Sequence, residues 1–155
     1  YVFPVAMVNQ TFNNNGLTQA ADIQAVPTTK LKEIFGADTA LYVTIDDYGT
    51  SYVVISSETR VTVTASLVDL ETGNMLWTGA ATASSAEQQN ANSGGLVGML
   101  VQAAVNQIFE TVTDRGFDIA AITSARLLSA ESYNGLLYGP RSPKYGQPVP
   151  SEKQK

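Results

Sequence analysis

The sequence predicts an α/β (α+β) domain, in which helices pack on a mixed β-sheet that contains a long antiparallel hairpin. Two patterns predict this fold class. Apolar and polar residues alternate over 59–69 and again over 75–83, and an apolar stripe with helical spacing runs through 96–114. The chain has 155 residues, of which 44% are hydrophobic, which is enough for one core. We expect a single body over 1–139 and a Pro/Gly-rich extended tail over 140–155.

The first third of the chain predicts a strand, a loop and two short helices. Residues 2–8 form an apolar run typical of a buried strand, and the Asn-rich stretch 9–16 is typical of a loop. Thr18 is predicted to cap a helix that ends before Pro27, because side-chain oxygens of this kind accept bonds from the first helical N–H groups. Thr28 is predicted to cap a second helix, which ends at Gly36 in the left-handed conformation.

A long β-region follows. Leu41, Val43 and Ile45 alternate with polar residues and predict a strand. The Asp-Asp-Tyr-Gly stretch at 46–49 then predicts a turn, with the next strand opening at Tyr52. Adjacent Asp46 and Asp47 would point to opposite faces of a strand, so we expect them to form part of the turn and not a metal site.

The clearest local signal is a hairpin around Glu71-Thr72-Gly73. A three-residue loop with Gly73 in the left-handed conformation pairs residues whose numbers sum to 144. This register places Leu67 opposite Trp77 and puts the apolar residues of both strands on one face. We therefore predict that Trp77 lies on the core side of the sheet.

The rest of the chain predicts a flexible polar loop over 84–95, a main helix over 96–114 closed by Gly116, and a short helix over 119–128. The first two turns of the main helix carry more apolar surface than one core stripe uses. Burial on several sides is one explanation, and a partner surface is the other. If these turns form a partner surface, we expect a homodimer or larger assembly. Its candidate interface residues are Leu96, Met99, Leu100 and Ala103.

Composition narrows the possible functions. The chain has no Cys and no His, which excludes disulfides, thiolate or imidazole metal sites, and Ser–His or Cys–His nucleophile pairs. The net charge of −5 argues against a nucleic-acid partner. The glycines at 94–98 lack the Lys of a phosphate-binding loop and predict a hinge. We expect no metal, no cofactor and no enzymatic activity.

Three functions remain open from the residues. The favoured one is a non-enzymatic interaction domain. The alternative is a module that binds peptidoglycan or another saccharide through Tyr48 and Tyr52, which flank the predicted turn at 46–49. A hydrolase that uses only Asp, Glu and Ser is a weaker alternative, because no convergent set of such residues stands at motif spacing.

Five segments resemble one family of bacterial outer-membrane lipoproteins of unknown function, a family that includes a genome-derived neisserial antigen. They are NGLTQAADIQAVPTTKLKEIFGAD (15–38), LYVTIDDYGTSYVVI (41–55), LVDLETGNMLWTG (67–79), SGGLVGMLVQAAVNQI (93–108) and GLLYGPRSPKYG (135–146). The resemblance covers nearly the whole chain and keeps the order of the motifs.

The resemblance implies several properties that the residues alone do not carry. Members have a signal peptide, a lipidated Cys, and a strand and helix upstream of the segment that opens this chain. They are similar in fold to the TolB N-terminal and CsgG-like domains. The resemblance therefore implies periplasmic exposure, outer-membrane anchoring by lipid, a dimer, and an accessory role in transport or envelope assembly with partners of unknown identity.

Overall fold

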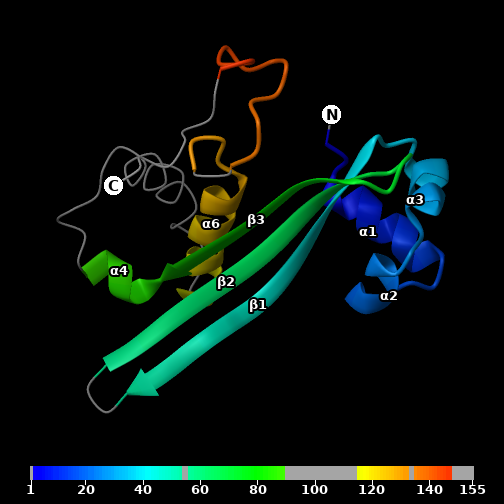
Figure 1. Ribbon diagram of the computed structural model, residues 1–155. Helices are drawn as coiled ribbons and strands as arrows, with labels where there is room; N and C mark the ends of the chain where they lie inside the picture. Colours follow the sequence, from blue (N-terminus) through cyan, green and yellow to red (C-terminus); the bar gives the residue numbers. More distant parts are fainter. Residues whose placement is uncertain (1, 54–55, 90–114, 133–134, 148–155) are drawn as a thin grey trace. The chain divides into compact units, whose positions relative to one another are not determined.

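The computed structural model describes residues 2–53, 56–89, 115–132 and 135–147, which form helices and one three-stranded sheet (Figure 1). This mixture of helices and sheet confirms the predicted fold class. Contacts divide the chain into two compact units. The first contains Tyr1–Tyr42 and Leu67–Leu76, and the second contains Val43–Ser66 and Trp77–Lys155. The division into a body over 1–139 and a tail over 140–155 stays a prediction.

The first unit begins with α1 (Val5–Asn14), so the strand predicted over 2–8 and the loop predicted over 9–16 are wrong. The carbonyl of Pro4 accepts bonds from the N–H groups of Met7 and Val8 at 3.0 and 3.1 Å, which starts the helix. Helical spacing then places Val8 and Phe12 against the core of this unit. A short continuous apolar run does not distinguish a strand from a helix. Here the helix is favoured because it buries Val8 and Phe12 in the core of this unit.

Two further helices follow, α2 (Ala20–Gln24) and α3 (Thr28–Phe35). The predicted caps are wrong, because Gln19 and Pro27 occupy the N-cap positions and neither makes a side-chain capping bond. Proline suits the start of a helix, where no N–H donor is required. The predicted end of α3 is confirmed, since Gly36 has φ 62°.

The core of the first unit is built around Phe12, Leu31 and Leu70. The Phe12 ring meets the Phe35 ring edge-on, with their centroids 5.6 Å apart. Leu70 is 1% exposed, and its N–H donates to the carbonyl of Asp38 at 2.9 Å. One residue from the β2–β3 turn thus completes a core that is otherwise supplied by the helices, the segments that join them and the start of the first strand.

The sheet has the order β1-β2-β3, with β1 at Thr39–Val53, β2 at Ser56–Asp69 and β3 at Met75–Ser84. The turn predicted at 46–49 is wrong, because β1 continues through these residues and includes Tyr52. Gly49 is not among the glycines with positive φ. Pairing with β2 over the whole length overrides the local turn preference of Asp and Gly.

The predicted register of β2 and β3 agrees with the position of two threonines. The hydroxyl oxygens of Thr62 and Thr82 lie 3.1 Å apart, as expected for a pair that sums to 144. Trp77 is partly buried against the core, which confirms its predicted side of the sheet. A Cβ at Gly79 would overlap the Trp77 ring, so the indole lies directly over this glycine. The pairing of Leu67 with Trp77 stays a prediction.

The loop that joins β2 to β3 differs from the prediction by one residue. Gly73 has φ 74°, as expected, but the Asp69 N–H donates to the carbonyl of Asn74 at 2.9 Å. Leu70 therefore belongs to the loop and not to a terminal strand pair. Its burial in the first unit explains the longer loop, and the Asp69 carboxylate stabilises it by accepting the N–H groups of Glu71 and Thr72.

In the second unit, α6 (Arg115–Leu128) packs on β2 and β3. The helix predicted over 119–128 is confirmed and is longer. Gly116, predicted to close the preceding helix, is instead buried in the first turn of α6. The core residues are Val61, Val63, Ala65, Ala83, Ile119, Ile122 and Leu127.

The flexible loop predicted over 84–95 is wrong in its first part, where Ser85–Gln89 form the short helix α4. The predicted main helix at 96–114 and the glycine hinge at 94–98 lie outside the described residues. The same holds for the candidate interface residues Leu96, Met99, Leu100 and Ala103.

Residues 139–147 form consecutive turns, so this part of the predicted tail is turned and not extended. Ser142 donates its N–H to the carbonyl of Gly139, and Tyr145 donates to the carbonyl of Ser142, at 2.9 and 3.0 Å. Lys144 forms an ion pair with Glu131, which also accepts the Tyr138 hydroxyl. Side chains on both sides of the gap at 133–134 are thereby joined.

Candidate functional site

The relative placement of β1 and β2 decides which side chains share a face. The hydroxyl oxygens of Thr50 and Thr59 lie 2.9 Å apart, which places these residues opposite each other. Thr59 is buried on the core side together with Val61. Side chains alternate along a strand, so the odd-numbered residues of β1 lie on the opposite face, beside Glu58 and Arg60 of β2.

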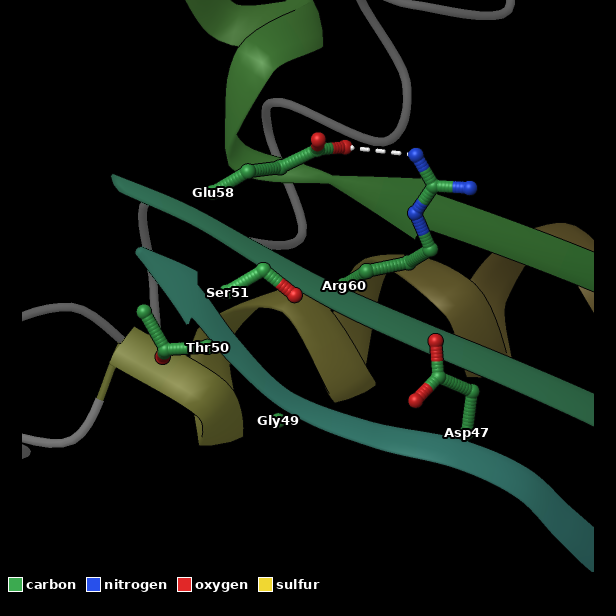
Figure 2. Close-up of a pocket in the computed structure, with 6 residues that line it drawn as sticks. All are labelled: Asp47, Gly49, Thr50, Ser51, Glu58 and Arg60. Atoms are coloured by element: carbon green, nitrogen blue, oxygen red, sulfur yellow. Dashed lines mark hydrogen bonds and ion pairs between the residues drawn. The ribbon is translucent and has the colours of Figure 1, made fainter. Parts of the chain in front are cut away.

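A shallow polar cleft lies near the end of the β1–β2 pair, and its charged side chains are on that opposite face (Figure 2). Its volume is about 290 Å³. Its charged groups are Asp47, Glu58 and Arg60, and the Arg60 guanidinium donates to the Glu58 carboxylate at 2.9 Å. For Asp47, no hydrogen bond or ion pair is present among the described residues. The full lining is Asp47, Gly49, Thr50, Ser51, Glu58 and Arg60.

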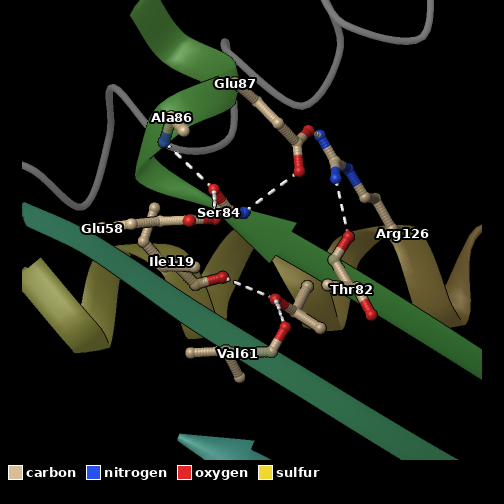
Figure 3. A network of polar contacts seen from close by, with 9 residues as sticks. Glu58, Val61, Thr82, Ser84, Ala86, Glu87, Ile119 and Arg126 are labelled. Atoms are coloured by element: carbon tan, nitrogen blue, oxygen red, sulfur yellow. Dashed lines mark hydrogen bonds and ion pairs between the residues drawn. The ribbon is translucent and has the colours of Figure 1, made fainter. Parts of the chain in front are cut away.

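Glu58 also joins a second set of polar contacts at the end of β3 (Figure 3). The Ser84 hydroxyl donates to the Glu58 carboxylate at 2.6 Å, and Ser84 is 8% exposed. Arg126 of α6 donates to the carbonyl of Thr82 at 2.7 Å and to the carboxylate of Glu87 at 2.6 Å. The cleft is thus connected through Ser84 to the start of α4 and through Glu87 to α6.

The start of α4 explains the position of Ser84. Its hydroxyl accepts the N–H of Ala86 at 3.0 Å, and Glu87 accepts the N–H of Ser84 at 3.1 Å. This reciprocal arrangement is a capping box, which satisfies N–H groups that have no partner inside the helix. Ser84 therefore has a structural role in addition to its bond with Glu58.

The electrostatics of Glu58 follow from these donors. Its pKa is lowered from the ordinary value, first by the hydrogen bond from Ser84 and then by that from Arg60, while burial acts in the opposite direction. The carboxylate is therefore ionised at neutral pH and is a weaker base than a free glutamate. The Ser84–Glu58 contact consequently offers poor activation of a serine nucleophile.

Replacing Ser84 with alanine should raise the pKa of Glu58, because the largest stabilising bond to its carboxylate is removed. A lowered folded-state pKa adds stability above the unfolded pKa, and this stability is lost as the pH falls through the folded pKa. The destabilisation by Ser84→Ala should therefore shrink on acidification. A carboxyl NMR titration measures the pKa, with the exposed Ser124→Ala as control. An unchanged Glu58 pKa would contradict the assignment.

The sequence-predicted ligand surface is only partly described. Tyr48 is 51% exposed and lies in β1, opposite Val61 in the register, so its side chain is on the other face from Asp47, and it is not among the residues that line the cleft. The side chain of Tyr52 lies outside the described residues. Asp46 and Asp47 occupy opposite faces, as predicted for neighbours, although they lie in a strand and not in a turn.

Sequence reasoning missed Glu58, Arg60, Ser84, Glu87 and Arg126. One local signal was available, because Ser84 and Glu87 have the Ser-x-x-Glu spacing of a capping box. No local signal joins Arg126 to Glu87, which is 39 residues away. Within the described residues, no group of three or more potential metal ligands occurs, and no helix is long and apolar enough to cross a membrane.

Comparison with known protein families shows which family this chain belongs to. Residues 1–141 match the family described as "Putative lipoprotein GNA1162-like". The chain belongs to this family. One relative, "Putative lipoprotein NMB1124/NMB1162" of Neisseria meningitidis serogroup B (strain ATCC BAA-335 / MC58), is 50% identical over 141 residues, covering 91% of this chain. The crystal structure of lipoprotein GNA1162 from Neisseria meningitidis has a TM-score of 0.55 at 50% identity, covering 72% of this chain and 76% of that chain.

Family membership confirms the resemblance drawn from the five sequence segments. The chain spans 65% of the length of the neisserial relative. Similarity to the TolB and CsgG domains stays a prediction.

Proposed function

We propose that this protein is the interaction domain of an envelope lipoprotein and that it acts by binding other proteins and not by catalysis. The domain would be held by an N-terminal lipid on the periplasmic side of the outer membrane, as an accessory of transport or envelope assembly. Membership of a lipoprotein family supports this localisation in the envelope. A homodimer through Leu96, Met99, Leu100 and Ala103 remains part of this proposal.

One observation of the second unit carries the binding role. Ile45 is 64% exposed and Val43 is 42% exposed, although both lie in the middle of a sheet strand. The register places them on the face opposite the core, and α6 packs on the core face. Apolar side chains left exposed on a sheet face are typical of a surface that a partner covers.

The chemistry of the cleft agrees with binding better than with hydrolysis. Glu58 is held by two donors that lower its pKa, so it is poorly suited to act as a general base. The saccharide alternative would use Tyr48 and Tyr52, and Tyr48 is not among the residues that line the cleft. The exposed apolar side chains therefore favour a protein partner.

Photo-crosslinking in the native envelope tests this proposal. A photoreactive residue at Ile45 should give a discrete protein adduct in intact cells that express the full-length lipidated protein. The same residue at Thr29, which is exposed on α3, serves as the control and should give none. The mass of the adduct distinguishes a second copy from another protein. Equal, diffuse labelling from both positions would contradict a specific interaction surface.

A further inference from the structure

α1 ends in a Schellman motif that places an Asn-Gly pair in its last turn. The N–H of Leu17 donates to the carbonyl of Phe12, and the N–H of Gly16 donates to the carbonyl of Asn13, each at 3.0 Å. Gly16 has φ 77°, the left-handed conformation that this motif requires. Leu17 and Phe12 also pack in the same core, which is the apolar contact that commonly accompanies the motif. Asn15 is therefore the C-cap residue of α1.

The Asn15–Gly16 pair is chemically labile. The main-chain N of Gly16 can attack Cγ of Asn15, because glycine has no side chain to obstruct the approach. The attack forms an N–Cγ bond, breaks the Cγ–Nδ2 bond and releases ammonia, which carries away the proton of the attacking N–H. Water then opens the cyclic imide at Cγ to give aspartate, or at the main-chain carbonyl carbon to give isoaspartate. Both reacting atoms belong to this chain, and water is the only other reactant.

The folded conformation holds the two reacting atoms apart. Ring closure requires the C–N bond to eclipse the Cα–Cβ bond of Asn15, at a ψ outside the main allowed regions of an L residue. Asn15 instead has ψ 11°, and the attacking N–H of Gly16 is bound to a carbonyl. The leaving amide is held as well, since Nδ2 of Asn15 donates to the carbonyl of Thr11 at 2.8 Å. The reaction therefore requires the last turn of α1 to open first.

We infer that Asn15 is a site of spontaneous deamidation and that local opening of the C-terminal end of α1 sets the rate of this reaction. Opening breaks the Schellman bonds of Gly16 and Leu17 and the bond from the Asn15 amide. It does not require the rest of the unit to unfold, because helix ends open more readily than a core. This property goes beyond the proposed interaction function and does not rest on it.

Both products disturb this helix end. An aspartate at position 15 has no N–H to donate to the carbonyl of Thr11, and its charge lies at the negative end of the helix dipole. An isoaspartate lengthens the main chain between Phe12 and Leu17, so the Schellman bond loses its register. Deamidation thus favours the open state of the last turn and weakens the core contact between Phe12 and Leu17.

Peptide mapping by mass spectrometry measures the reaction in the purified protein at neutral pH. The readout is the mass shift that replacement of –NH₂ by –OH gives at Asn15, and fragment masses separate it from Asn13, Asn14 and the other Asn-Gly pair at 134–135. The synthetic peptide Phe-Asn-Asn-Asn-Gly-Leu-Thr, which has the sequence of 12–18, is the unfolded reference. We expect conversion of Asn15 about 10–100-fold more slowly in the folded protein than in the peptide. In guanidinium, the two rates should agree within about twofold.

Two substitutions test whether local opening sets the rate. Leu17→Ala should raise the rate at Asn15 by roughly threefold or more, because it removes the apolar contact of the Schellman motif. Ile23→Ala is the matched control, since it removes an apolar side chain from the same core without touching the motif, and it should change the rate by less than about twofold. Circular dichroism establishes that each variant is folded.

Asn15→Asp reproduces one product and tests its effect on the helix end. This variant should lower the melting temperature by about 1–4 °C, because a donor is lost and a negative charge is added at the end of α1. Asn9→Asp, the same substitution in the middle of α1, is the control and should lower it by less than about 1 °C.

Each measurement has an outcome that would overturn part of the inference. Equal rates in the folded protein and the peptide would show that the Schellman motif does not protect Asn15. Conversion more than about a hundredfold slower than in the peptide would show that this end of α1 opens too rarely for Asn15 to be a modification site. Equal acceleration by Leu17→Ala and Ile23→Ala would overturn local opening as the route, and an unchanged melting temperature of Asn15→Asp would overturn the effect on the helix end. The photo-crosslinking result at Ile45 is independent of all these outcomes.

Discussion

Replacing Leu70 with alanine should lower the free energy of unfolding by about 2–5 kcal/mol. Leu70 is 1% exposed and lies in the core of the first unit with Phe12 and Leu31. The substitution removes buried methyl groups and leaves a cavity that the helices can fill only in part. Urea denaturation followed by circular dichroism measures the loss.

Leu76→Ala is the matched control for Leu70→Ala, because it is the same substitution near the other end of the same turn. Leu76 is 54% exposed, so its truncation should cost less than about 1 kcal/mol. Similar losses for the two variants would show that Leu70 does not complete the core of the first unit. Burial of Leu70 would then not explain why the β2–β3 loop is one residue longer than predicted.

Leu127→Ala should have an effect of similar size in the second unit, about 2–5 kcal/mol. Leu127 is 6% exposed and packs with Val61 and Ile122 between α6 and the sheet. The adjacent Leu128 is 46% exposed on the same helix, so Leu128→Ala should cost less than about 1 kcal/mol.

Trp77 provides a direct probe for this pair of variants. It is the only tryptophan of the chain and packs against the same core. Its emission should therefore report unfolding of the second unit, with a lower urea midpoint for Leu127→Ala. Equal midpoints for the two variants would mean that α6 packs on the sheet through another face than the one that Leu127 occupies.

Elements with a strong local signal could be predicted from the sequence. The helix at 28–35 was predicted, and so was the left-handed Gly36 that ends it. The β2–β3 hairpin was predicted with Gly73 at positive φ, because the alternation of both strands and the turn residues agreed on one register. In each case, neighbouring residues within a few positions carry the information.

Other elements depended on contacts that the local sequence does not contain. The apolar run at 2–8 suits a strand and a helix equally, and packing of Phe12 against α3 made it a helix. The stretch 46–49 has the composition of a turn, but pairing with β2 keeps it in β1. Leu70 joined the loop because it is buried in a core built by distant helices.

The candidate site shows the same limit. Glu58 meets Ser84 across 26 residues, and Arg126 meets Glu87 across 39 residues. Contacts between residues so far apart in the sequence leave no short motif by which they could be predicted. The exposed side of β1 is also a property of the sheet, because the strand pattern indicates that Val43 and Ile45 share a face but not whether a helix covers it.

The sequence by itself determined the family, the mixed α/β class, the β2–β3 hairpin and the exclusion of His- and Cys-based chemistry. These follow from composition, from short-range alternation and from segments whose order is kept. Only the tertiary structure decided that β1 runs without a turn from Thr39 to Val53, that its apolar face points away from α6, and that Glu58 is held by Ser84 and Arg60. The physical reason is that burial and strand pairing join residues far apart in the chain, and their free energy exceeds the preferences of single residues for turns or loops.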